Sequence, residues 1–283
     1  MLIRLLRSLL SEPGAVEFIV IDQSAPAAPG LVEAPLPEDP RLRYFRSATR
    51  GKGAALNEGL RLAQGEIVVC TDDDCEAKPG WAQAFAAVLL AEPRGAVAFC
   101  NVAAAPFDPA LGFIPTFEPK RDRVVRSLAL LRRPGLGAGM ALRRSAVLEL
   151  GGFDESFGPG SHFPSCDDWD IAVRAVLRGW WLCEVAGISI THHGFRNFLE
   201  GREHARRDWT ALGAACAKPL LAGYPSAAPL AAWTFLRHAV FPPFSELVRL
   251  RRPHGLVRIT SFLRGFIEGL RTRVDPKTLR FLP

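Results

Sequence analysis

The sequence predicts an α/β sandwich around a mostly parallel mixed sheet, followed by a helical extension. Short apolar runs alternate with helical segments, and glycine or proline marks most boundaries between them. Strands and helices that alternate with such short connections are typical of helical layers on both faces of a sheet. With 283 residues, 48% of them hydrophobic, the chain can bury a core of this kind.

The expected elements follow one another without an internal repeat. Leucines recur on one helical face of residues 2–10, which predicts an amphipathic helix packed on the sheet. Strands are expected over 16–21, 41–45, 65–70, 96–100 and 180–190. Helices are expected over 54–62, 81–90, 144–150 and 169–178, with loops at 107–133. We expect one catalytic domain over 1–194 and a helical extension over 195–283, broken at Pro242-Pro243.

Charge separates these two parts. Residues 195–283 contain 15 Lys and Arg against 6 Asp and Glu, whereas residues 1–194 contain 20 against 23. A basic extension beside an acidic region predicts contact with an anionic surface, such as a membrane face or a charged acceptor. Nucleic acid is not expected as a partner, because the sequence has no zinc finger, recognition helix or RNA-binding aromatic pattern.

Cysteine usage and hydropathy bear on the compartment. The six cysteines form no CxxC pair, which favours a reduced, cytoplasmic setting over a disulfide scaffold or a zinc site. No apolar run approaches the ~18–20 residues that cross a bilayer. We therefore expect a cytoplasmic protein, with the basic extension as a means of peripheral contact at the inner membrane face.

Carboxylates lie at the ends of two expected strands. Asp22 follows the first strand, and Asp72-Asp73-Asp74 follows the third. Ligands of such sheets bind beyond the carboxyl ends of the strands. Three adjacent aspartates favour a hard divalent cation, Mg²⁺ or Mn²⁺, which takes oxygen ligands and leaves positions for phosphate oxygens. The alternative is a solvated acidic turn or a helix cap.

Three further motifs contain groups that could bind or react. Asp167-Asp168 is an acidic pair in which each carboxylate raises the pKa of the other, as suits a general base, or it caps the following helix. His192-His193 offers an imidazole to a metal, or only a hydrogen-bonded loop. Gly135, Gly137 and Gly139 allow close approach of a ligand to the backbone, or a simple turn.

The order of these motifs is more specific than any one of them. Asp22-Gln-Ser is followed by Gly51-Lys-Gly with Asn57, by the aspartate triplet, by Gly139-Met-Ala-Leu-Arg-Arg, by Gly151-Gly-Phe-Asp-Glu and by Asp167-Asp-Trp-Asp. Over roughly residues 1–195 the chain resembles the family 2 glycosyltransferases, which have the GT-A fold. That resemblance implies an inverting, metal-dependent transfer of a hexose or deoxyhexose in cell-surface glycan synthesis.

The resemblance also assigns roles to residues. The donor would be a UDP-, GDP- or dTDP-linked sugar, and the acceptor a glycan or a lipid-linked molecule. Nucleotide-sugar contacts fall on Asp22, Lys52, Asn57, Asp72, Asp73, Gly139 and Asp154. The Mg²⁺ or Mn²⁺ contacts fall on Asp72, Asp74 and His193, with His192 as the neighbouring candidate. Asp168 matches the catalytic base, preceded by Asp167 where the family more often has Glu.

One departure from the family concerns the first strand. The chain begins in the helix that normally follows that strand, so the sheet is expected to lack an interior strand and to keep open edges. Either the start codon is misassigned, or the chain is a truncated, catalytically impaired homologue that acts as a binding module. Nucleotidyl transfer onto a sugar phosphate is a second enzymatic alternative, but its Gly-rich loop with Arg and Lys is absent here.

Overall fold

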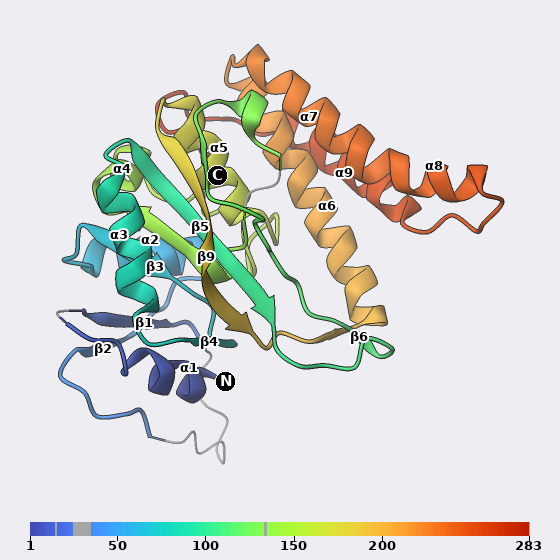
Figure 1. The fold of residues 1–283 in the computed structure, drawn as a ribbon. Coiled ribbons are helices and arrows are strands. Elements are labelled where there is room, and N and C mark those ends of the chain that lie inside the picture. Colours follow the sequence, from blue (N-terminus) through green and yellow to red (C-terminus); the bar gives the residue numbers. More distant parts are fainter. Residues whose placement is uncertain (15, 25–34, 133–134, 283) are drawn as a thin grey trace.

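A mixed sheet between two helical layers forms the body of the protein (Figure 1). The computed structural model describes residues 1–14, 16–24, 35–132 and 135–282. The central sheet has the strand order β3 (Ile67–Cys70), β8 (Met140–Arg143), β5 (Gly95–Ala104), β9 (Trp181–His192) and β4 (Cys75–Ala77), with β7 (Arg123–Val125) also paired to β9. The α/β sandwich expected from the sequence is confirmed.

Strand directions in this sheet are more mixed than the sequence predicts. β5 and β9 pair in parallel, whereas β8 pairs antiparallel with both β3 and β5. β3, β5 and β9 therefore run the same way, and β8 is inserted between two of them in the opposite direction. β8 and the short β4 were not expected as strands, since the glycine-rich approach to β8 and the acidic turn before β4 obscure their pattern.

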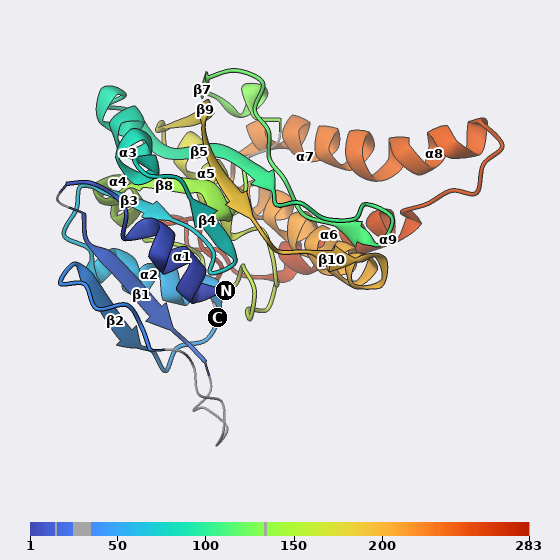
Figure 2. The ribbon, with the colours of Figure 1, turned by 60° about the horizontal axis from the view of Figure 1, so that its bottom comes forward.

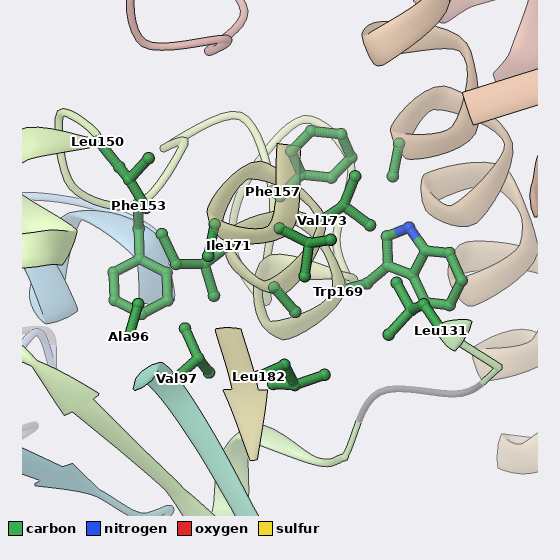
Figure 3. Close-up of a cluster of buried hydrophobic side chains, with 14 of the residues drawn as sticks. Ala96, Val97, Leu131, Leu150, Phe153, Phe157, Trp169, Ile171, Val173 and Leu182 are labelled. Carbon is green, nitrogen blue, oxygen red and sulfur yellow. The ribbon is translucent and has the colours of Figure 1, made fainter. Parts of the chain in front are cut away.

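Helices cover both faces of the sheet. α1 (Leu2–Leu9) and α3 (Trp81–Ala91) pack on one face, and α2 (Lys52–Leu62), α4 (Arg144–Glu149) and α5 (Asp167–Leu177) lie on the other. β5 is buried on both faces because its side chains alternate, with Phe99 in one core cluster and Cys100 in the other. Figure 3 shows the larger cluster, where Phe153, Trp169 and Ile171 meet Val97 and Leu182 of the sheet.

Two strands form a sheet of their own. β1 (Phe18–Asp22) pairs in parallel with β2 (Leu42–Arg46). Within the described residues, β1 has no second partner strand and β3 pairs with β8 alone. Residues of both β1 and β3 line one cleft, so their unpaired edges border the same space. Open edges at this position agree with a sheet that lacks one interior strand.

The loop expected at 107–133 contains short ordered pieces. β6 (Gly112–Phe113) pairs with β10 (Arg196–Asn197), β7 pairs with β9, and one 3₁₀ turn spans η1 (Leu128–Leu130). Another 3₁₀ turn, η2 (Gly137–Gly139), precedes β8. These pieces are too short to give a sequence period, and they hold the segment against the ends of the sheet.

Helices make up most of the chain after β10. α6 (Phe198–Leu221) packs along α9 (Leu256–Arg271), and between them lie η3 (Pro225–Ala227), α7 (Ala228–Thr234), a π-helix η4 (Phe235–Val240) and α8 (Phe241–Val248). α6 and α9 approach closely at glycines, since a Cβ on Gly265 would overlap the backbone of Thr210. Among the described residues, no helix combines the length and apolarity that crossing a membrane requires.

The prediction that the helical extension is interrupted at Pro242-Pro243 is wrong. Both prolines lie in the first turn of α8, directly after the π-helix η4, and the helix continues through them. The preceding π-helix leads directly into α8 at Phe241. α7, η4 and α8 therefore run as one continuous helical segment from Ala228 to Val248.

A buried ionic cluster joins α6 to α5 and to the segment before it. The Lys218 side chain is 1% exposed, and its Nζ donates to Asp154 Oδ2 at 2.7 Å and also contacts Asp170. Arg174 Nε pairs with Asp170 Oδ2 at 2.8 Å, and the same guanidinium donates to the carbonyls of Leu150 and Gly152. Burial alone would raise the pKa of Asp154, but Lys218 holds it below its usual value.

We expect Lys218→Met to unfold the protein at much lower urea concentration. The substitution keeps most of the side-chain volume but leaves the buried carboxylates of Asp154 and Asp170 without their common cation, which costs about 3–5 kcal/mol. Lys277→Met is the matched control, because Lys277 is exposed, and its urea midpoint should stay at the wild-type value. Equal midpoints for the two variants would contradict a stabilising role of the cluster.

Candidate active site

A large cleft opens beside the free edges of β1 and β3. Its volume is about 1840 Å³, and it is lined by α1, α2, both strand edges and the turn after β3. Lys52, the three aspartates 72–74, Asp167, Asp168 and His192 all border it. Motifs from distant parts of the sequence therefore meet in one cleft.

Lys52 lies at the centre of the acidic groups. Gly51, with φ of 89°, precedes α2, and Lys52 is the first residue of that helix. Its Nζ pairs with Asp72 Oδ1. Burial alone would lower the pKa of Lys52, but the charges of Asp72, Asp167 and Asp168 raise it well above its usual value. Lys52 therefore remains a cation and neutralises part of the acidic charge.

Asp167 and Asp168 are the first two residues of α5. Asp168 Oδ2 accepts a hydrogen bond from the Gly137 N–H at 2.9 Å, and its Oδ1 accepts one from the Trp169 N–H. Asp167 is buried, and its Oδ2 has no hydrogen-bond partner. Burial and the neighbouring Asp167 charge raise the pKa of Asp168 to about 7, and burial also raises the pKa of Asp167. Asp168 can thus hold or release a proton near neutral pH.

The turn after β3 presents its aspartates in different directions. Asp72 pairs with Lys52, Asp73 is exposed, and Asp74 faces His192, whose Nε2 lies 3.3 Å from Asp74 Oδ2. The hydrogen bond from His192 lowers the pKa of Asp74. Burial alone would lower the pKa of His192, but its bonds to Asp74 and to the Pro115 carbonyl raise it overall.

His193 points away from this pair. Its Nε2 lies 3.1 Å from Glu76 Oε2, and its Nδ1 lies 3.0 Å from a nitrogen of Arg4. Only its backbone N–H contacts the triplet, through the Asp74 carbonyl. The metal contact expected on His193 therefore has its side chain turned elsewhere, and His192 occupies the position beside Asp74.

Asp74 and His192 fit a divalent cation in part. No three Cys, His, Asp or Glu side chains converge on a metal position in the described part of the chain. A carboxylate and an imidazole in contact nevertheless supply two donors of the kind that Mg²⁺ and Mn²⁺ accept, and such ions take further ligands from phosphates and water. The protein alone thus offers a partial coordination shell.

Asp22 lies at the end of β1. Its Oδ1 accepts from the Ser24 N–H at 2.7 Å, and its Oδ2 accepts from the Tyr44 hydroxyl. Hydrogen bonding from the Ser24 and Tyr44 side chains lowers the pKa of Asp22, so it stays a carboxylate at neutral pH. It does not line the cleft itself, although the strand that carries it does.

Three other expected contacts serve packing in this structure. Asn57 bonds both backbone groups of Phe153 and fixes the turn after Gly152, and Asp154 belongs to the buried cluster with Lys218. Gly139 packs against β5, where a Cβ would come within 2.8 Å of Cys100 Sγ. None of the three lines the cleft. Each therefore affects the site only by positioning the neighbouring segments that it contacts.

Gly137 and His192 belong to the site, and the sequence named each only as one of several neighbouring candidates. A Cβ on Gly137 would lie 3.1 Å from Lys52 Nζ, and its N–H orients Asp168. The glycine-rich stretch indicated close backbone approach, but the motif alone does not tell which of its glycines faces the site. Of the two adjacent histidines, the one that contacts Asp74 is the one whose side chain points into the cleft at the end of β9, and the sequence does not tell which one that is.

Solved structures with the same architecture are glycosyltransferases. A mannosyltransferase, PcManGT from Pyrobaculum calidifontis in complex with GDP-Man and Mn²⁺, aligns with a TM-score of 0.56 and 17% identity, covering 94% of this chain and 81% of that one. S. aureus TarS 1-349 aligns with a TM-score of 0.59 and 15% identity, covering 94% and 76%. GalNAc-T7 with UDP, GalNAc and Mn²⁺ aligns with a TM-score of 0.52 and 15% identity, covering 86% and 56%.

At these identities the likeness shows the fold. No curated protein sequence matches the chain. The sequence model described as "Glycosyl transferase family 2" matches residues 1–150, which is more than half of the 283 residues. That region contains the Gly51-Lys52 start of α2, the aspartate triplet and the strands β1, β2 and β3. The chain therefore belongs to glycosyltransferase family 2 and is a glycosyltransferase of the GT-A fold.

Proposed function

We propose that the protein transfers a sugar from a nucleotide-sugar to a hydroxyl acceptor with inversion, and that Asp168 is the catalytic base. The observation that carries the proposal is the position of Asp168 in the cleft beside Asp167, with its pKa near 7. A base is most effective when its pKa is close to the working pH. The family match ends before Asp167, so this role rests on the geometry of the site.

In the proposed reaction, the acceptor oxygen attacks the anomeric carbon from the face opposite the leaving group. The bond from that carbon to the nucleoside diphosphate breaks, and the acceptor proton passes to Asp168. Gly137 orients one carboxylate oxygen of Asp168, which leaves the other near the start of α5. A single displacement of this kind inverts the configuration at the anomeric carbon.

The departing diphosphate needs positive charge. Lys52 supplies one cation in the cleft, and its Nζ is bound to Asp72. Asp74 and His192 would hold Mn²⁺ or Mg²⁺, which neutralises the diphosphate when bound. The mannosyltransferase and GalNAc-T7 structures contain Mn²⁺ together with a nucleotide or nucleotide-sugar, which supports a nucleotide-linked donor here. Donors linked to UDP, GDP or dTDP remain the proposed set.

His204, Asp208 and Trp209 of α6 and Arg258 of α9 also line the cleft. The part of the cleft that they line is the proposed acceptor end. Aromatic and charged side chains at this end suit a glycan or a lipid-linked sugar. We therefore propose that the reaction is a step of cell-surface glycan synthesis.

A second candidate function is that of a binding module with impaired catalysis. The unpaired edges of β1 and β3 favour it, because they leave one wall of the cleft open beside the donor position. Hydrolysis of UDP-, GDP- and dTDP-sugars during titration with Mn²⁺ separates the two candidates. Metal-dependent release of nucleotide supports the enzyme, and nucleotide binding without release supports the module.

Replacing the base should remove turnover and leave binding intact. We expect Asp168→Asn to lower the turnover number by roughly 10²–10⁴-fold, because asparagine cannot accept the proton of the acceptor hydroxyl. Calorimetry should give a nucleotide affinity close to wild type, since the Lys52 and Asp74 side chains are unchanged. Asn also caps a helix well, so the substitution tests chemistry with little structural change.

Stability provides the control for this variant. The pKa of Asp168 is raised in the folded state, so between its usual value and about pH 7 the folded protein binds the proton more tightly than the unfolded chain. The free energy of unfolding therefore falls as pH rises through that range. Asp168→Asn should melt at or above the wild-type temperature at pH 8.

Turnover in the two aspartate variants decides which residue is the base. Normal turnover in Asp168→Asn with an inactive Asp167→Asn would assign the base to Asp167. Normal turnover in both variants would refute the proposal that either aspartate is the catalytic base.

Adjacent histidines test the metal proposal. We expect His192→Gln to weaken Mn²⁺-dependent nucleotide binding at least roughly tenfold, because an imidazole beside Asp74 is lost. His193→Gln is the matched control and should bind as wild type does, since His193 contacts Glu76 and Arg4. Calorimetry with and without Mn²⁺ measures both. If only His193→Gln weakened the Mn²⁺-dependent nucleotide binding, His193 and not His192 would be the metal ligand.

A further inference from the structure

The continuous helical segment from Ala228 to Val248 projects away from the body of the protein. Figure 2 shows α7 and α8 extending past the end of α6, with the loop after α8 at the tip and α9 returning from it. We call residues 228–255 the arm. α7 and η4 are anchored at their base by the buried side chains of Leu230, Ala231 and Ala239. The arm is thus fixed at one end and open to solvent at the other.

One face of the arm exposes large apolar side chains. From Trp233 to Leu247 they recur every three to five residues, as in a helix with a π-helical stretch, and they comprise Trp233, Leu236, Phe241, Phe244, Leu247 and the adjacent Val248. Phe244 is 60% exposed and Val248 67%. At the tip, Leu250 is 96% exposed and holds a φ of 57°, which is uncommon for leucine. An apolar face of this extent marks an interaction surface.

The charge around this face is almost entirely positive. Arg249, Arg251 and Arg252 follow the apolar face at the tip, and all three are exposed. Residues 222–267 contain six arginines and a single acidic residue, Glu246. Glu246 is already engaged, because its carboxylate accepts the His254 N–H at 2.5 Å. The apolar side chains and the arginines therefore form one cationic, amphipathic surface.

An anionic lipid surface fits this combination better than a second copy of the chain. In a two-fold contact through the arms, one cationic surface would meet another, and Glu246, the single acidic residue of 222–267, is already bonded to His254. Anionic headgroups instead attract the arginines, while aromatic and leucine side chains enter the boundary between headgroups and acyl chains. The helices in the described residues are too short or too polar to span a bilayer, so the arm would lie on it.

We propose that the arm is a membrane-docking surface that binds bilayers containing anionic lipids. Docking would place the acceptor end of the cleft near the bilayer, because Arg258 lines the cleft and lies in the first turn of α9, directly after the arm. Arg258 also lies over the ring of Trp209 of α6, 5.8 Å from its centroid. Lipid-linked acceptors would then reach the cleft from the membrane side. The binding itself does not depend on sugar transfer.

Vesicle co-sedimentation of the full chain tests the docking surface. We expect binding to vesicles of phosphatidylcholine with phosphatidylglycerol and much weaker binding to phosphatidylcholine alone. The combined substitution of Arg249, Arg251 and Arg252 by Gln should weaken binding to the anionic vesicles about a hundredfold, at roughly fivefold per arginine. Phe244→Glu with Leu247→Glu should abolish it. Added salt should weaken the wild-type binding.

Leu90→Glu is the matched control, because Leu90 is an exposed leucine of α3 outside the arm. This substitution should leave vesicle binding unchanged. Thermal melting must show that the arm variants fold, and their nucleotide binding in solution should equal that of the wild type. Lack of wild-type binding to anionic vesicles would overturn the proposal. So would a wild-type dimer that the Phe244→Glu, Leu247→Glu variant converts to a monomer, because the second copy would then be the occupant.

Discussion

Lys52 brings one positive charge between carboxylates that two distant segments supply. Asp72 comes from the turn after β3, and Asp167 and Asp168 come from the start of α5. Without a cation, three carboxylates around one cleft would repel one another and raise each other's pKa. The charge of Lys52 therefore allows these segments to approach, and it sets how readily Asp168 gives up its proton.

Helix α5 links this cleft to the buried ionic cluster. Its first two residues face Lys52, whereas Asp170 turns inward to Arg174 and Lys218. Acidic residues are favoured in the first turn of a helix, where the backbone N–H groups point toward them. Lys218 also binds Asp154, which accepts the Phe281 N–H near the end of the chain. The position of the proposed base thus depends on contacts that reach α6 and the C-terminal segment at Phe281.

Much of the site follows from the sequence because strand ends of one direction meet at one edge of a sheet. That rule places the aspartate triplet at the carboxyl end of β3, whereas Lys52 and Asp168 lie at helix starts, and the family resemblance indicated that they belong to the same site. It does not choose between His192 and His193, because side chains alternate along β9 and a shift of one residue exchanges them. Nor does it reveal that Asp154 pairs with Lys218, since nothing local in an alanine-rich helix indicates which carboxylate, 64 residues away, its lysine will meet.

The most direct test of this account is the pH dependence of turnover in Lys52→Met. Removing the lysine charge removes the interaction that lowers the pKa of both Asp167 and Asp168. The acidic limb of the pH–rate profile should therefore move to higher pH than in the wild type, and Lys52→Arg, which keeps the charge, should leave the limb close to its wild-type position. If turnover is too slow to follow, NMR titration of the Asp168 carboxyl gives the same shift. An acidic limb and a carboxyl titration unmoved in Lys52→Met would contradict the account.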